Sequence, residues 1–138
     1  MENLIKIRYG WLKIMYIYNA LGAGLLGLAT LLIPDTLSSV FNLPAQDPVI
    51  FGIVGSTYLA FGLVSLMGIK SPLKFVPVLL LQMTYKIIWF AGVVAPLLVK
   101  GQLPSYSYIF IFVFATYIAG NIIAIPFRWV FNGKEVSL

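Results

Sequence analysis

The chain has 138 residues, of which 61% are hydrophobic and 9% charged, and it contains neither cysteine nor histidine. A soluble domain is about half apolar and about a quarter charged, so this composition excludes a water-soluble core and predicts a membrane protein. The net charge of +5 does not indicate nucleic acid, because the basic residues lie singly at the ends of apolar runs. The missing cysteine and histidine exclude disulfides, thiolate or imidazole metal ligands and histidine acid–base chemistry.

Four apolar runs are long enough to cross a bilayer, which takes about 20 helical residues. They predict spans at residues 11–33, 48–69, 75–99 and 106–131. Breaks rich in proline, glycine and serine separate these runs. We therefore expect an all-α membrane protein in which residues 1–138 form a single four-helix transmembrane bundle.

The first connection, PDTLSSVFNLPAQDP, predicts a short helix. Asp35 can cap a helix in which Leu37, Val40 and Phe41 share one face. An apolar face of this kind is typical of a helix lying in the membrane interface, and the alternative is a structureless loop of similar length. We expect an interfacial helix between the first two spans, on the outer leaflet.

Small residues at four-residue spacing predict where the first two spans touch, because small side chains let helix backbones approach closely. The first span carries Ala20 with Gly24 and Ala23 with Gly27, and the second carries Gly52, Ser56 and Ala60.

One lysine, Lys86, lies near the middle of the third span, within LLLQMTYKIIWFAG. A lysine at that depth costs about 2.5–3.5 kcal/mol to insert. Either end of the helix is about 18 Å away, too far for the side chain to reach. We therefore expect Lys86 to point into the bundle or a wet cavity, as a functional group or as a structural lysine bonded to carbonyls and hydroxyls.

Matching depths across the spans places a polar belt around Lys86. The belt comprises Asn19, Ser56, Tyr58, Gln82, Tyr117 and Asn121, and Trp89 lies one turn beyond the lysine. No acid lies at this depth, so Lys86 has either to lose its proton or to hold an anion or carbonyl that a ligand supplies. The predicted ligand-binding residues are Lys86, Gln82, Tyr58, Tyr117, Asn121, Asn19 and Trp89, although each belt residue taken alone is better explained by interhelical hydrogen bonding.

Catalytic constellations are missing from the sequence. It has no paired carboxylates, metal-ligand cluster, glycine-rich phosphate loop or nucleophile–base pair, so we expect no catalytic residue, metal or cofactor. Tyr85 adjoins Lys86, but neighbouring helical residues point about 100° apart. Tyr58 or Tyr117 is therefore the expected partner of the lysine.

The nine basic residues are distributed unequally across the predicted membrane. Seven flank the spans on one side and one flanks them on the other. The seven are Lys6, Arg8, Lys13, Lys70, Lys74, Arg128 and Lys134, and the one on the opposite side is Lys100. The positive-inside rule then predicts that both termini are cytoplasmic.

The stretch IPDTLSSVFNLPAQDPVIFGIVGSTYLAFGLVSL resembles the small four-helix bacterial membrane proteins of the DoxX-like kind. These often show a helix ending in proline, a segment ending in a phrase like Phe-Asn-Leu-Pro, and a glycine-dotted second helix. The resemblance implies a bacterial inner membrane, and some members are described as membrane partners of quinone-linked oxidoreductases. It carries over no catalytic residue. Four-helix sterol isomerases and sigma-type receptors look similar, but they need acids buried in the bundle, which this sequence lacks.

The sequence thus predicts a non-enzymatic membrane protein that binds a hydrophobic carbonyl or anionic ligand, such as a lipid or quinone, or serves as an accessory subunit of a membrane complex. One alternative is an oligomeric transporter or anion channel, which requires a homo-oligomer because four helices seldom enclose a pore. The other is a lipid-modifying enzyme built on the lysine and tyrosines. Expected partners are the bilayer, a hydrophobic small molecule, and a second copy or larger complex, with no nucleic acid.

Overall fold

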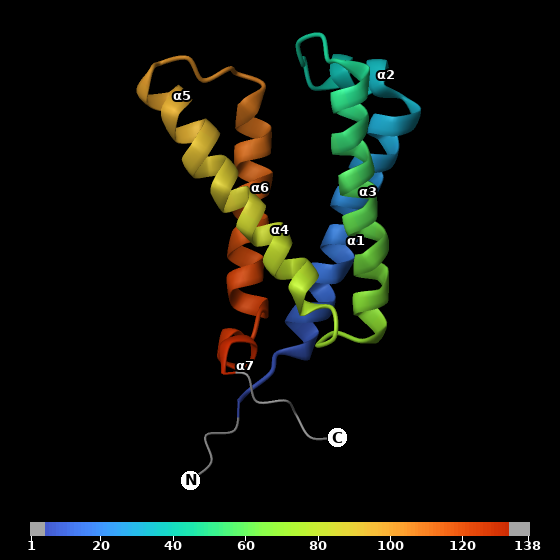
Figure 1. The fold of residues 1–138 in the computed structure, drawn as a ribbon, viewed down its shortest axis with the longest axis vertical. Helices are drawn as coiled ribbons and strands as arrows, with labels where there is room; N and C mark the ends of the chain where they lie inside the picture. Colours follow the sequence, from blue (N-terminus) through green and yellow to red (C-terminus); the bar gives the residue numbers. More distant parts are fainter. Residues whose placement is uncertain (1–4, 133–138) are drawn as a thin grey trace.

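Helices and their connections make up residues 5–132, the part of the chain that the computed structural model describes. The helices are α1 (Tyr9–Leu32), α2 (Pro34–Val40), α3 (Pro48–Lys70), α4 (Val76–Trp89), the π-helical turn η1 (Phe90–Val94), α5 (Ala95–Val99), α6 (Ser107–Ala124) and α7 (Phe127–Phe131). Four helical spans, Tyr9–Leu32, Pro48–Lys70, Val76–Val99 and Ser107–Ala124, are long and apolar enough to cross a membrane. The predicted all-α, four-helix membrane class is confirmed (Figure 1).

The third span is a single helical run made of α4, η1 and α5. Pro96 has no N–H to continue the α-helical ladder, and just before it the N–H of Ala95 bonds to the carbonyl of Phe90, five residues back. Figure 1 shows this span leaning across the bundle, from beside the end of α3 towards the start of α6. The tilt separates its second half from α3.

The fourth span ends at Ala124, seven residues before the predicted end. Pro126 explains the difference, because proline disfavours helical backbone at the residue before it. Ile125 is accordingly extended, with φ −70° and ψ 125°, and the short helix α7 begins after the break.

Backbone contact joins α1 to α3. A Cβ added to Gly27 would lie 2.6 Å from the carbonyl oxygen of Gly55 and 2.9 Å from the Cα of Leu59. A Cβ added to Gly62 would overlap the backbone of Gly24. The face predicted for the first span is thus confirmed at Gly24 and Gly27.

The face predicted for the second span is wrong. Ser56 and Ala60 are exposed, and a Cβ at Gly52 would meet nothing within 4 Å. Gly55 and Gly62 make the contact instead, two helical turns apart on a different side of α3. Ser56 therefore faces lipid and not the belt around Lys86.

The first connection is helical, as predicted, but Asp35 does not cap it. Pro34 takes the first helical position and Asp35 lies in the first turn, so the residue at the cap position is Ile33. Asp47 is the acid that caps a helix: its carboxylate accepts hydrogen bonds from the N–H groups of Val49 and Ile50, at 3.0 and 2.9 Å, at the start of α3.

The apolar face of α2 is narrower than predicted. Val40 is 68% exposed, whereas Leu37 and Phe41 are half-buried and face the interior of the bundle. The ring of Phe41 contacts that of Phe110 on α6, with 5.4 Å between the ring centroids. This contact holds α2 over one end of the bundle, where Figure 1 shows it.

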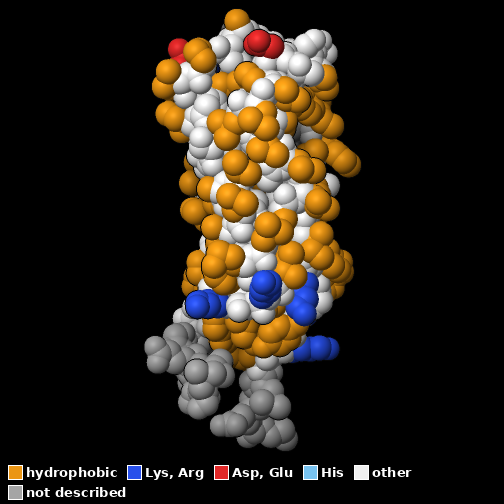
Figure 2. Space-filling view, turned by 90° about the vertical axis from the view of Figure 1, so that its right-hand side faces the viewer, with side chains coloured by type: hydrophobic (Ala, Val, Ile, Leu, Met, Phe, Trp, Pro, Cys, Tyr) orange, Lys and Arg blue, Asp and Glu red, His pale blue; other side chains and the backbone are white. Residues whose placement is uncertain are grey.

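The two halves of the bundle differ in packing. The half nearest the termini holds the main apolar core, to which α1, α4 and α6 contribute Leu12, Met15, Tyr16, Val76, Leu79, Met83, Tyr117 and Ala124. On the face that Figure 2 shows, basic side chains lie near this end and acidic ones at the other, with apolar side chains between. Lys134, which the sequence places with the basic band, lies outside the described residues.

Candidate functional site

Lys86 points into the bundle, as predicted, and is 1% exposed. Its ammonium donates hydrogen bonds to the side-chain oxygen of Gln82, to the backbone carbonyl of Gln82 at 3.3 Å and to the hydroxyl of Tyr85 at 2.9 Å. All three N–H groups therefore find acceptors on α4 itself. The two acids among the described residues are Asp35, in the first turn of α2, and Asp47, at the start of α3, so neither pairs with Lys86 and the buried cation is held without a carboxylate.

Aromatic rings surround the ammonium on its open side. The Nζ atom lies 4.2 Å from the ring centroid of Tyr85, 4.4 Å from that of Tyr117 and 5.1 Å from that of Phe114. A cation over an aromatic face is attracted by the negative face of the ring, and the attraction grows where water is excluded. These rings supply part of the stabilisation that a carboxylate would otherwise give.

The tyrosine hydroxyl bonded to Lys86 belongs to Tyr85, so the expected hydroxyl partner is wrong, whereas Tyr117 does contact the ammonium across the bundle through its ring. The 100° angle between adjacent residues applies to their Cα–Cβ bonds. Both side chains are long enough to converge above the helix, where the tyrosine oxygen meets the ammonium. Tyr117 presents its ring face instead.

Hydrogen bonds fix the Tyr117 ring in that orientation. Its hydroxyl donates to the carbonyl of Tyr18 at 3.0 Å, and the two rings stack with 4.0 Å between centroids and 12° between planes. The hydroxyl of Tyr18 lies 2.7 Å from that of Thr116. A Cβ at Gly22 would overlap the Tyr117 hydroxyl, so a glycine there makes room for the contact.

Two adjoining cavities lie between the helices on the open side of Lys86. The inner one, of about 200 Å³, is lined by Lys86 and by Tyr18, Gly22, Ala23, Leu26, Tyr58, Tyr85, Val113, Phe114 and Tyr117. The outer one, of about 450 Å³, extends to α2 and also carries Thr30, Leu37, Phe41, Leu43, Gln46, Phe51, Val54, Trp89, Tyr106 and Phe110. Leu26, Tyr58, Tyr85 and Phe114 line both cavities.

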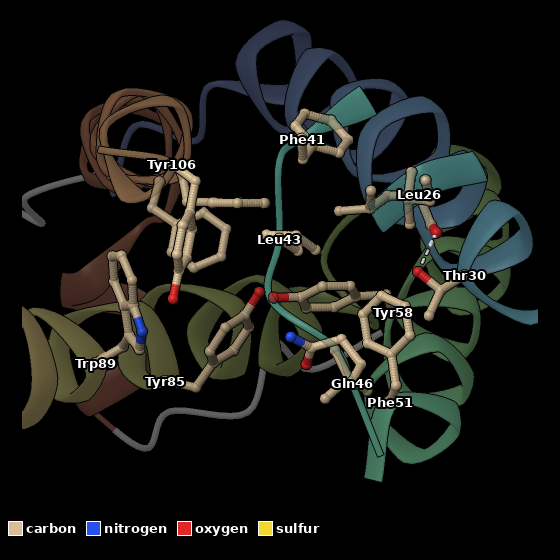
Figure 3. Close-up of a pocket in the computed structure, with 14 residues that line it drawn as sticks. Leu26, Thr30, Phe41, Leu43, Gln46, Phe51, Tyr58, Tyr85, Trp89 and Tyr106 are labelled. Carbon is tan, nitrogen blue, oxygen red and sulfur yellow. Dashed lines mark hydrogen bonds between the residues drawn. The ribbon is translucent and has the colours of Figure 1, made fainter. Parts of the chain in front are cut away.

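Figure 3 shows the side chains that line the outer cavity. The hydroxyls of Tyr58 and Tyr85 point toward one another from α3 and α4, while Trp89 and Tyr106 form the wall on the α4 and α6 side. The outer cavity is therefore an aromatic chamber with few polar groups, and it shares four lining residues with the inner cavity, which Lys86 lines.

The predicted site residues divide into two groups. Gln82, Tyr58, Tyr117 and Trp89 contact Lys86 or line the cavities. Asn19 and Asn121 are fully buried but line neither cavity. The predicted ligand-binding set missed several lining residues, among them Tyr18, Leu26, Tyr85 and Phe114, together with Leu37 of α2 and Phe41 directly after it.

Three buried amides lack partners for their side chains. Asn19 on α1 and Asn121 on α6 make no side-chain hydrogen bond with the described residues, and neither does the amide nitrogen of Gln82. Buried polar atoms are nearly always bonded to protein or to ordered water. These amide atoms are therefore groups that buried water molecules would satisfy.

The buried polar groups around Lys86 are of a kind that can bind an oxygen-bearing group. The described residues contain no cluster of acids that could hold a metal, and the buried polar groups include a cation, amides and phenols but no carboxylate. Such a set can orient and neutralise an oxygen-bearing head.

Comparisons of the chain with protein-family models, with curated proteins and with solved structures give no match.

Proposed function

We propose that this small integral membrane protein binds an apolar molecule with an anionic or carbonyl head. The head pairs with the ammonium of Lys86, and the apolar body occupies the aromatic chamber under α2. The observation that carries the proposal is the position of Lys86 in the lining of the inner cavity, which adjoins the outer one, with no acid among the residues that line either cavity.

Charge is the first support. The N–H groups of Lys86 have acceptors on α4, but no carboxylate balances the charge of the ammonium. A ligand anion in contact with it would supply the missing negative charge. The tyrosine hydroxyls at the junction of the cavities can donate to the same head. A neutral carbonyl would accept hydrogen bonds from the same donors but would bind less strongly, because it carries no charge.

Size and lining are the second support. Small-molecule sites are concave, mostly apolar and about 300–1,000 Å³ in volume, with a few polar groups that orient the ligand. The outer cavity of about 450 Å³ lies in that range. A chain of methylene groups or a flat ring would fit between its aromatic walls.

We further propose that the chain lies in a bacterial inner membrane with both termini cytoplasmic. The charge distribution and the DoxX-like resemblance support this location. A role beside a quinone-linked oxidoreductase would suit a protein that holds a carbonyl-bearing apolar molecule.

Binding is tested with dibrominated stearate, whose bromine atoms quench tryptophan fluorescence on contact. Substituting Trp11→Phe and Trp129→Phe leaves Trp89, which lines the outer cavity, as the reporter. We expect saturable quenching that Lys86→Met weakens at least tenfold, equivalent to about 1.4 kcal/mol. The corresponding methyl ester should bind more weakly than the acid, since it keeps the carbonyl and loses the charge.

Lys74→Met is the matched control, because it removes an exposed lysine that lies just before α4 and lines neither cavity. It should leave quenching unchanged. Equal quenching in the wild type and in Lys86→Met would refute the proposal, as would a stearyl amine probe that binds as tightly as the acid.

Topology is tested by labelling single cysteines placed at Asp47 and at Ser137. The predicted orientation requires Asp47→Cys to react only from outside the cell and Ser137→Cys only after permeabilisation. Asp47 lies at the start of α3, whereas Ser137 lies outside the described residues. Labelling of both positions from the same side would rule out four spans with cytoplasmic termini.

A further inference from the structure

A third cavity lies at the opposite end of the bundle from α2. It has a volume of about 360 Å³ and is formed where the segment before α1 meets the end of α6 and the start of α7. Lys6, Arg8 and Arg128 line it, and no acid among the described residues does. We call it the basic groove.

The break at Pro126 creates the groove. The N–H of Phe127 bonds to the carbonyl of Ile125 at 3.0 Å, so it does not reach back to Ile123 as it would in a continuing helix. The guanidinium of Arg8 donates to the carbonyl of Ile123 at 3.3 Å instead. This bond uses one of five N–H groups on Arg8, and the others remain available.

The wall of the groove is apolar and faces outward. Ile122 is 57% exposed and Ile123 is 40% exposed, on the stretch of α6 that belongs to a membrane span. A ligand in the groove would therefore touch cationic groups at one end and hydrocarbon along its side. A free inorganic anion would contact the cationic groups and leave the side chains of Ile122 and Ile123 uncovered.

We propose that the basic groove binds the phosphate of an anionic phospholipid, with an acyl chain lying along Ile122 and Ile123. Arginine and phosphate form paired, charge-assisted hydrogen bonds, and basic groups at the ends of membrane helices attract anionic headgroups. Three cations drawn from the segment before α1 and from α7 give the phosphate a defined seat. The site is separate from Lys86 and does not depend on the function proposed for it.

The test uses the full chain in neutral detergent and counts bound lipids by native mass spectrometry. Dioleoyl phosphatidylglycerol is compared with dioleoyl phosphatidylcholine, which has the same acyl chains and no net charge. We expect one phosphatidylglycerol to bind in clear preference to phosphatidylcholine. The double variant Lys6→Gln/Arg128→Gln should reduce this preference by about fivefold for each charge removed.

This double variant spares the fold, because neither side chain makes a hydrogen bond among the described residues and the bond from Arg8 to Ile123 stays. Arg8→Gln, tested separately, should also weaken binding. The matched control is Lys70→Gln/Lys74→Gln, which removes two exposed cations outside the groove and should leave the preference intact.

Three results would overturn the proposal. Phosphatidylcholine binding as well as phosphatidylglycerol would show that charge does not select the lipid. An equal loss in the control pair would show diffuse surface attraction in place of a site. Displacement of the lipid by an equal concentration of inorganic phosphate would show that the groove takes the free anion.

Discussion

Replacing Gly27 with alanine is expected to destabilise the bundle by about 1–3 kcal/mol, the usual effect of overpacking a tight contact. The added methyl group would collide with backbone atoms of Gly55 and Leu59, which cannot turn aside as a side chain can. α1 and α3 would have to move apart along their whole contact. Gly62→Ala should act in the same way, because its methyl group would overlap the backbone of Gly24.

The measurement is the free energy of unfolding in mixed micelles, titrated with sodium dodecyl sulfate and followed by circular dichroism. Two alanine variants serve as controls. Gly52→Ala lies on the same helix as Gly62 and meets nothing within 4 Å, and Gly24→Ala brings its methyl group to an ordinary 3.5 Å from the Cα of Gly62. Both should stay near the wild type or gain about 0.5–1 kcal/mol from the better helix former. If Gly27→Ala matches these controls, the helices do not meet at their backbones.

The four spans could be predicted because the signal is local. A membrane requires about 20 apolar residues in a row, and the sequence states this length directly. Helix ends were less predictable: Pro126 stops α6 early, and Pro34 displaces Asp35 from the cap position of α2. In both cases the covalent geometry of proline overrode a reading based on hydrophobic length or capping preference.

The contact face of α3 could not be predicted, because glycine and other small residues occur on more than one side of that helix. Gly52, Ser56 and Ala60 follow a regular small-residue spacing, yet Gly55 and Gly62 meet α1. Small residues permit close approach without requiring it. The choice depends on the partner surface, which a single helical sequence does not contain.

The burial of Lys86 was predictable from energy alone, since lipid exposure of a lysine at mid-depth is prohibitive. Its surroundings were not predictable in the same way. Tyr85 joins it through side-chain flexibility, and the residues that line the chamber come from helices far apart in the sequence. Asn19 and Asn121 show the same limit: their depth predicted burial correctly, but not that they would lie apart from the cavities.

Removing the acceptor that holds Lys86 is expected to cost more than removing the lysine itself. Gln82→Met should destabilise the protein by about 1–3 kcal/mol, because it deletes the side-chain oxygen that accepts from a buried ammonium. Lys86→Met should leave the free energy of unfolding unchanged or raise it. The substitution keeps an unbranched apolar stem of similar length and removes a charge that has no acid to pair with.

The double variant Gln82→Met/Lys86→Met tests whether the Gln82 side chain stabilises the ammonium. In the Lys86→Met background, Gln82→Met should be neutral or stabilising, because the Gln82 amide already has an unpaired nitrogen and would then have an unpaired oxygen as well. The two substitutions should therefore couple by about 1–3 kcal/mol, as groups in direct contact do. The measurement is again sodium dodecyl sulfate unfolding of all four proteins. If Gln82→Met costs the same with and without the lysine, the bond between the two side chains does not hold the ammonium, and the rings of Tyr85, Tyr117 and Phe114 stabilise it without that acceptor.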